Sequence, residues 1–251
     1  MIVLSAIAVV LGSISQRVAG LGFALLVAPI FVLTFGPYGG VVLINFAGTI
    51  SSILVLLRLR KNIDWNKYLL LGPPAALAII PTSFIVVYFN GPVLQIVIGM
   101  ILLIGLAVAL SNPPAEEREP KWWHTVLTGA AAGITSATAG VGAPPMGIYA
   151  AATGWKHQDF SATLQPVFVT TGAVSFISKV VIAGGVPSFD PSIWIGVIAL
   201  SGIGLAIGEW VRPFISAETA RVIALGLCLA GAFAATVDGG VSLLIPAHQL
   251  G

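Results

Sequence analysis

Charged residues are what this sequence has least of. Only 8% of its 251 residues are Asp, Glu, Lys or Arg, whereas 57% are hydrophobic and the mean hydropathy is +1.03. A soluble domain carries about 25% charged residues, because a surface that faces water has to be polar. Eleven basic and nine acidic side chains cannot cover a water-soluble protein of this length. The composition therefore excludes that class and predicts an integral membrane protein.

Cysteine, histidine and catalytic motifs are also scarce. The single cysteine, Cys228, excludes an internal disulfide, and the three histidines lie at the ends of hydrophobic stretches, far in sequence from Ser13 and Ser136. No zinc-protease, serine-hydrolase or paired-aspartate pattern is present, and no Lys/Arg cluster is large enough to bind nucleic acid. The sequence predicts no enzyme activity, no cofactor, no metal and no nucleic-acid partner. The expected partners are a lipid bilayer and a small solute.

Long apolar segments fill most of the chain. Eight of them stand between polar residues, and they cover 1–35, 38–58, 67–89, 92–110, 123–154, 160–184, 191–213 and 219–237. The fourth is apolar on every face, which excludes the alternating strands of a membrane barrel. About 20 helical residues cross the hydrocarbon core of a bilayer, and six segments fit one such crossing. The predicted fold class is an all-α membrane protein, a polytopic helical bundle in the cell membrane.

The first and fifth segments are too long for one crossing, and glycines interrupt both. The breaks fall at Gly20 and Gly22 in the first segment, and at Gly140 and Gly142 in the fifth, where two prolines follow. Glycine permits a turn, and proline stops the helix from continuing directly. Unwound backbone inside a membrane is tolerated only where protein or a water-filled cavity receives its polar groups. We therefore expect a cavity at these breaks.

The positions of the breaks indicate an internal duplication. Sliding the sequence by about 120 residues places the first break on the second, and Asn45 on Gln165. The hydrophilic linker 112–121 falls near the middle of the chain. We predict a first repeat at 1–111 and a second at 122–251, each with four membrane segments.

The distribution of basic residues distinguishes two topologies. If all eight segments cross the membrane, seven basic loop residues lie on one side and three on the other. If the first and fifth segments instead enter and leave on the same face, nine lie on one side and only Lys179 on the other. The positive-inside rule favours this second arrangement, in which the two repeats are inverted. The linker is then cytoplasmic, and both termini lie outside.

The helix that restarts after each break is the strongest indication of a binding site. Its N-terminal N–H groups, with their partial positive charge, face the gap and can bind an anion. Close helix packing through small residues is the alternative explanation of the glycine pairs. Matched breaks in both halves favour the binding site.

Arg17 lies halfway through the first segment, just before its break. A guanidinium at membrane depth is costly, and its planar fork suits an oxyanion; snorkelling to an interface is the alternative. No acidic residue is near it in sequence, which leaves a substrate anion as its expected partner. The predicted substrate-binding residues are Arg17, Gln16, Gly20, Gly22, Asn45, Ser136, Thr138, Gly140, Gly142 and Gln165.

Two other charged residues receive plainer interpretations. Glu209 and Arg212 are three apart near the end of the seventh segment, a spacing that predicts a pair on the helix surface. Lys179 lies deep in the sixth segment and is expected to snorkel to the interface, with a place in the cavity left open.

Three stretches resemble the TauE/SafE sulfite exporter family of membrane permeases. Residues 140–149, Gly-Val-Gly-Ala-Pro-Pro-Met-Gly-Ile-Tyr, are similar to the family pattern Gly-x-Gly-Gly-Pro-Pro-x-x-x-Tyr. Residues 58–65 resemble its link of basic residues followed by Asp-Trp, and residues 203–208 its small-residue helix. The resemblance extends over essentially the whole chain. It implies export of sulfite, an organosulfonate or a related small anion.

The absence of carboxylates from the middle of every segment agrees with export. No such group is placed to couple flux to protons or sodium. Because the cell interior is negative, a monoanion is driven outward without a coupling ion, whereas uptake would need one. A passive anion channel and a structural membrane component are the alternative functions. Assembly into a homo-oligomer is left open.

Overall fold

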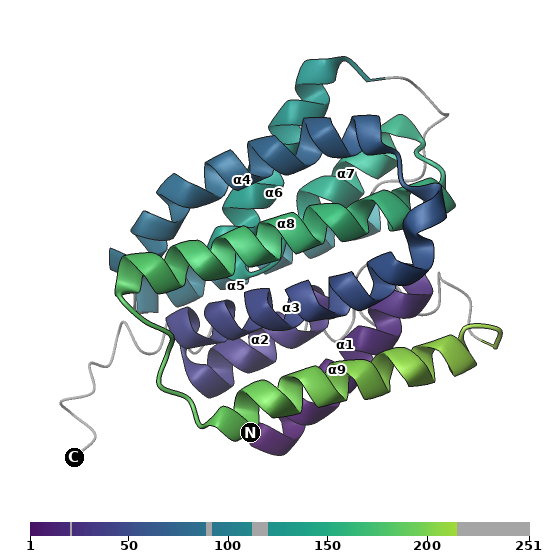
Figure 1. Ribbon diagram of the computed structural model, residues 1–251. Coiled ribbons are helices and arrows are strands. Elements are labelled where there is room, and N and C mark those ends of the chain that lie inside the picture. Colours follow the sequence, from purple (N-terminus) through teal and green to yellow (C-terminus); the bar gives the residue numbers. More distant parts are fainter. Residues whose placement is uncertain (21, 89–91, 112–119, 215–251) are drawn as a thin grey trace.

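The computed structural model describes residues 1–20, 22–88, 92–111 and 120–214, and within these ranges it contains helices and no strands (Figure 1). The elements are α1 (Ile2–Ala19), α2 (Phe23–Phe35), α3 (Pro37–Leu59), η1 (Arg60–Asn62), α4 (Trp65–Tyr88), α5 (Pro92–Ser111), α6 (Trp122–Ala139), α7 (Ala143–Thr153), α8 (His157–Ala183) and α9 (Pro191–Val211). Five helices, α1, α3, α4, α8 and α9, are long and apolar enough to cross a membrane. The all-helical membrane fold is confirmed. The predicted segment 219–237 and Cys228 lie outside the described residues.

Local sequence explains where the single-crossing helices begin. Pro37 and Pro191 stand at the starts of α3 and α9, where a missing N–H removes no helical hydrogen bond. Asp190 caps α9, because its carboxylate accepts the backbone N–H of Ser192 at 2.8 Å. The predicted segments at 38–58, 67–89, 92–110, 160–184 and 191–213 correspond to α3, α4, α5, α8 and α9.

The two broken segments fold back on themselves. At the first break the chain turns between α1 and α2, and the hydroxyl of Ser5 at the start of α1 donates to Thr34 at the end of α2 (3.2 Å). At the second break α6 and α7 do the same, and the hydroxyls of Thr125 and Tyr149 lie 2.9 Å apart. Each segment is therefore a hairpin whose two ends lie together, not a straight rod.

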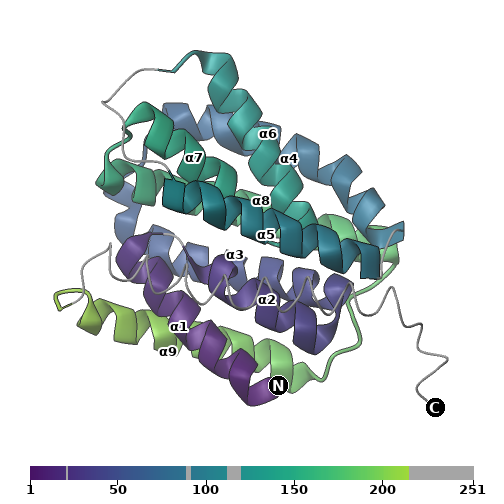
Figure 2. The same ribbon diagram turned by 180° about the vertical axis from the view of Figure 1, so that it is seen from behind.

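Helices α1 and α9 pack side by side in the same direction (Figure 2). A Cβ atom added to Gly204 would lie 2.6 Å from the carbonyl oxygen of Val10, and one added to Gly208 would lie 3.1 Å from the Cα of Ile14. Contacts this short require glycine, because any side chain would push the helices apart.

Helices α4 and α6 form a second pair of the same kind. A Cβ on Gly129 would lie 2.9 Å from the Cα of Leu71, and a Cβ on Gly133 would lie 2.9 Å from the Cα of Ala75. These helices also run in the same direction. In both pairs a helix from one half of the chain packs against a helix from the other half, so the two halves are interleaved.

Helices α3 and α8 occupy the middle of the molecule and run antiparallel (Figure 1). Tyr38 at the start of α3 donates to the backbone oxygen of Lys179 near the end of α8 (3.3 Å), whereas the N–H of Asp64, beyond the end of α3, donates to Thr163 near the start of α8 (2.9 Å). Large apolar side chains are exposed around the outside of the bundle, as lipid contact requires. They include Leu69, Leu77, Val181, Ile195 and Trp210.

Candidate functional site: a polar cavity between two helix breaks

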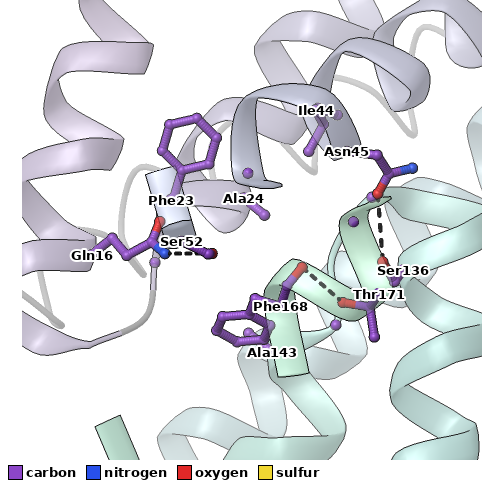
Figure 3. Close-up of a pocket in the computed structure, with 15 residues that line it drawn as sticks. Gln16, Phe23, Ala24, Ile44, Asn45, Ser52, Ser136, Ala143, Phe168 and Thr171 are labelled. Carbon is purple, nitrogen blue, oxygen red and sulfur yellow. Dashed lines mark hydrogen bonds between the residues drawn. The ribbon is translucent and has the colours of Figure 1, made fainter. Parts of the chain in front are cut away.

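A cavity lies where the two breaks approach the central helices α3 and α8 (Figure 3). Its lining residues are Gln16, Gly22, Phe23, Ala24, Ile44, Asn45, Gly48, Ser52, Ser136, Gly140, Gly142, Ala143, Phe168, Thr171 and Gly172. The space open to the centres of water-sized spheres is about 40 Å³. One water needs roughly 10–15 Å³ by this measure, so the cavity has room for only a few atoms. It suits a small solute.

The first break presents the N-terminus of α2 to the cavity. Gly20 and Gly22 have φ angles of 77° and 120°, which side chains strongly disfavour. The first hydrogen bond inside α2 runs from the N–H of Leu26 to the carbonyl oxygen of Gly22 (3.1 Å). The N–H groups of residues 22–25 therefore have no acceptor within the helix, and an anion in the cavity could accept them.

The second break presents the N-terminus of α7, with fewer donors. Gly140 has a φ angle of 73° and ends α6, and Gly142 precedes the first residue of α7, Ala143. Pro144 and Pro145 follow and have no N–H group. A helix usually begins with four N–H groups that have no acceptor within the helix, and here only those of Gly142 and Ala143 are present. The site is consequently asymmetric, with more backbone donors from the first half of the chain.

Asn45 lines the same cavity and carries a buried amide. The residue is 2% exposed, and its Oδ1 accepts a hydrogen bond from the hydroxyl of Ser136 (3.4 Å) (Figure 3). Its Nδ2 is buried and has no hydrogen-bond partner among the described residues. A buried amide N–H without an acceptor costs about 1–3 kcal/mol.

Gln16 lines the cavity, but protein groups occupy its amide. Its Nε2 donates to the hydroxyl of Ser52 (2.9 Å) and to Oε1 of Gln165 (3.1 Å), and its Oε1 accepts from Ser51 (2.9 Å). This network fixes α1 against α3 and α8. Gln16 therefore shapes the wall of the cavity.

Gln165 lies behind that wall and holds the first break in place. Its Nε2 donates to the carbonyl oxygen of Gly20 (3.0 Å) and to that of Ser161 in its own helix (2.8 Å). The carbonyl of Gly20 belongs to the unwound turn and has lost its helical partner, so the amide replaces that partner. The sequence grouped Gln165 with the substrate; the structure places it against the backbone of the break.

The cavity lining contains residues 120 positions apart in the chain. The pairs are Gln16 with Ser136, Gly22 with Gly142, Phe23 with Ala143, Gly48 with Phe168, and Ser52 with Gly172. Asn45 lies 120 positions before Gln165, and Ser136 lies 120 positions after Gln16. The hydrogen bond between Asn45 and Ser136 therefore has a counterpart in the hydrogen bond between Gln165 and Gln16. Such exchange of contacts between two halves is typical of repeats related by a twofold axis.

Arg17 lies apart from this cavity. It lines a second pocket of about 280 Å³ together with Val18, Leu59, Asn62, Gln158, Ser161 and Arg212. This pocket lies where α1, α3 and α9 end and α8 begins. Ser161 lines it and also contacts Gly20, so the layer of Gly20, Gln16 and Gln165 lies between the two pockets.

Arg17 already has a protein partner, Glu209. Its Nε donates to the Glu209 carboxylate, and Nη1 of Arg58 lies 3.2 Å from the same oxygen. The expected pairing of Glu209 with Arg212 is therefore wrong, and the partner of Arg17 in the structure is Glu209, whereas the sequence pointed to a substrate anion. The close packing of α1 and α9 at Gly208 brings these charges together, although 192 residues separate them in sequence.

Two further expectations are changed by the fold. Thr138 does not line the cavity, and its hydroxyl donates to the carbonyl of Ile134 in its own helix (2.8 Å). Lys179 is completely buried, so the prediction that it snorkels is wrong. No group of three or more His, Cys, Asp and Glu side chains suited to a metal occurs within the described ranges.

Several lining residues were not predicted from the sequence. Ile44, Phe168 and Gly172 are apolar or small and resemble ordinary core residues of a membrane helix. Comparison of residues 120 positions apart along the chain would have related Ser52 to Gly172. It would not have selected Ile44, which the cavity gains through its contact with Gly140.

Long apolar helices around a small polar cavity define a helical membrane protein suited to moving a solute. The chain belongs to the sulfite exporter TauE/SafE family, whose sequence pattern matches residues 4–235. This is a family of membrane transporters of sulfur anions, and the protein is accordingly a membrane transporter. No curated protein and no solved structure matched the chain.

Proposed function

We propose that this protein exports a small sulfur-containing oxyanion, sulfite or an organosulfonate, through the cavity between the two breaks. The observation that carries the proposal is the small cavity that Asn45 lines together with two helix N-termini; the amide nitrogen of Asn45 has no partner among the described residues. All of these groups donate hydrogen bonds, and no carboxylate is among the described lining residues. A lining of donors favours an anion over a cation or a neutral solute.

The pocket around Arg17 acts as the entrance to this site. Arg17 and Arg212 line the pocket, no carboxylate is among its described lining residues, and Arg58 approaches the carboxylate that pairs with Arg17, so the pocket attracts anions. An arriving oxyanion can compete with Glu209 for the fork of Arg17 before it passes the Gly20 break. Arg17 thus binds the substrate at the entrance, before it reaches the inner cavity.

The proposed orientation places the entrance in the cytoplasm of a cell whose membrane the chain crosses several times. Basic residues gather at that end, among them Arg58, Arg60, Lys61 and Arg212, and the positive-inside rule assigns it to the cytoplasm. The paired lining residues support inverted repeats at 1–111 and 122–251. Homo-oligomers are compatible with this arrangement, since the cavity is lined by one chain.

The test is binding and efflux of sulfite with an amide variant. Asn45→Ala should weaken sulfite binding about 10- to 100-fold, because a hydrogen bond to a charged group contributes about 1.5–3 kcal/mol. Asn66→Ala removes an exposed amide in the first turn of α4 and should leave binding unchanged. Calorimetry on purified protein gives affinity, and release from loaded proteoliposomes gives flux.

The outcomes of this test separate the candidate functions. Saturable efflux that Asn45→Ala impairs supports a transporter with its site in the cavity. Efflux that rises linearly with sulfite would indicate a passive channel, and absence of both binding and flux would leave a structural role. Binding that survives Asn45→Ala unchanged would contradict the proposed site.

A further inference from the structure

Lys179 is the least expected charge in the structure. Its side chain is fully buried, and Nζ has no hydrogen-bond partner within the part of the chain that the structure describes. Burial of an ammonium without a partner is strongly unfavourable, so such a residue is retained for a reason other than stability. In a membrane transporter, a buried ionisable residue usually marks the path of the solute.

The position of Lys179 relates it to the cavity. Thr171 lines the cavity, and Ser175 and Lys179 follow at intervals of four residues along α8, which places all three on one side of the helix. All three are buried, and the Ser175 hydroxyl, like the Lys179 ammonium, has no partner among the described residues. The rise of a helix separates Thr171 from Lys179 by about 12 Å. The hydroxyl of Thr171 donates to the carbonyl oxygen of Phe168 (3.4 Å), so a row of three buried polar side chains, of which Ser175 and Lys179 lack a described partner, leads away from the cavity.

This row leads toward the end of the bundle opposite the Arg17 pocket. Tyr38, at the start of α3, donates to the backbone oxygen of Lys179. Leu59, at the end of α3, lines the pocket that contains Arg17 and Arg212. The length of α3 thus separates the two cationic positions, and the cavity lies between them.

We propose that Lys179 is a second anion-binding position, on the exit half of the path. The proposal rests on the export function proposed above. Its ammonium receives the sulfur oxyanion after the donors of the cavity release it, and Ser175 provides a hydroxyl along the way. A solute that must leave one site needs a competing site nearby, and a cation without a partner among the described residues, about 12 Å along the helix, supplies one.

The experiment compares Lys179→Met and Lys179→Arg with the wild type and with Lys121→Met, a control at an exposed lysine. In proteoliposomes Lys179→Met should lower the kcat of sulfite efflux at least about tenfold, the loss expected for a hydrogen bond to a charged group. Its KM should stay within about twofold, because the inner cavity is intact. Lys179→Arg should retain most of the flux, and Lys121→Met all of it.

Thermal unfolding separates this role from a structural one. Because the unpaired ammonium is a cost to folding, Lys179→Met should have an unchanged or higher Tm. A lower Tm, or failure to fold, would overturn the proposal, as would efflux at the wild-type rate. Loss of flux together with a raised KM would place Lys179 in the inner site instead and would also overturn it. Absence of efflux by the wild type would overturn both this assignment and the export function.

Discussion

At the scale of single residues, the presence or absence of hydrogen-bond partners separates the proposed binding groups from the supporting ones. Gln16 and Gln165 are saturated by protein partners and stabilise the first break. Asn45 and Lys179 have buried donors with no partner in the part of the chain that the structure describes, where an unpaired donor is costly. Residue type alone does not reveal this difference, because asparagine and glutamine carry the same amide.

Because Arg17 and Glu209 form an ion pair, substitutions of the two residues should change the affinity for sulfite in opposite directions. Glu209→Gln frees the Arg17 guanidinium and should tighten sulfite binding at the entrance, whereas Arg17→Ala should weaken it. The Glu209 side chain is 44% exposed, so solvent limits the pair to about 1 kcal/mol and each change to about fivefold. Binding isotherms at low ionic strength provide the measurement.

The Arg17→Lys variant separates the effect of the positive charge on sulfite affinity from the effect of the planar guanidinium geometry. Arg17→Lys should recover only part of the affinity that Arg17→Ala loses, because an ammonium cannot bind an oxyanion through two parallel N–H groups. If Glu209→Gln and Arg17→Ala change the affinity in the same direction, competition between Glu209 and the substrate is excluded.

At the scale of elements, the glycine breaks combine a backbone requirement with a packing requirement. Gly20 has a φ angle of 77°, and a Cβ atom there would overlap the side chain of Ser161. Gly184, which follows α8, has the same left-handed conformation with a φ angle of 74°, but nothing lies within 4 Å of its Cβ position. The two glycines therefore separate the cost of backbone conformation from the cost of packing.

Alanine at these two positions should lower stability by different amounts. Gly184→Ala should cost about 1–2 kcal/mol, the penalty of a left-handed backbone for an L-residue. Gly20→Ala should cost this and more, because the turn must move away from Ser161 and the hydrogen bond from Gln165 is strained. Thermal unfolding in detergent measures both variants. Equal losses of stability would show that packing at the first break is loose.

At the scale of the whole molecule, the two halves are interleaved, and this arrangement decides the topology. Lys121 precedes α6, which runs in the same direction as α4 and begins at the same end. Val186 follows α8 at the opposite end, and it is 56% exposed. A topology of eight plain crossings would instead place both residues on one side of the membrane.

Cysteine labelling at these positions tests the orientation. In a Cys228→Ser background, Lys121→Cys should react only with reagents that reach the cytoplasm, and Val186→Cys should react from outside. Wild-type flux by both variants confirms that the labelled proteins are intact. Reaction of both cysteines from the same face would exclude the inverted arrangement.

The energy source of transport is also a property of the whole molecule. The described lining of the cavity contains no carboxylate that could carry a proton or hold sodium. Moving one charge through the membrane is worth about 2.3 kcal/mol per 100 mV. Efflux of a monoanion should therefore accelerate as the inside of a valinomycin-clamped proteoliposome becomes more negative. Flux that follows a pH or sodium gradient at zero potential would contradict uncoupled export.

The sequence by itself determined the class of the fold and the location of the breaks. Scarcity of charge and the length of the apolar segments predicted a helical membrane protein, because lipid accepts no unpaired polar backbone. Glycines at 20, 22, 140 and 142 located both turns, and Gly20, Gly22 and Gly140 have positive φ angles that few other residues adopt. The 120-residue shift related positions such as Asn45 and Gln165 before any contact between helices was known.

Only the tertiary structure decided which polar groups are free. Arg17 pairs with Glu209 because α1 and α9 pack closely at Gly204 and Gly208. The two residues are 192 positions apart in the chain, so the sequence alone does not reveal the pair. Lys179 is enclosed because α8 lies at the centre of the bundle, whereas its sequence suits a helix end that reaches the interface. Hydrogen bonds and ion pairs act over a few ångströms, so their partners are set by helix packing and not by position in the sequence.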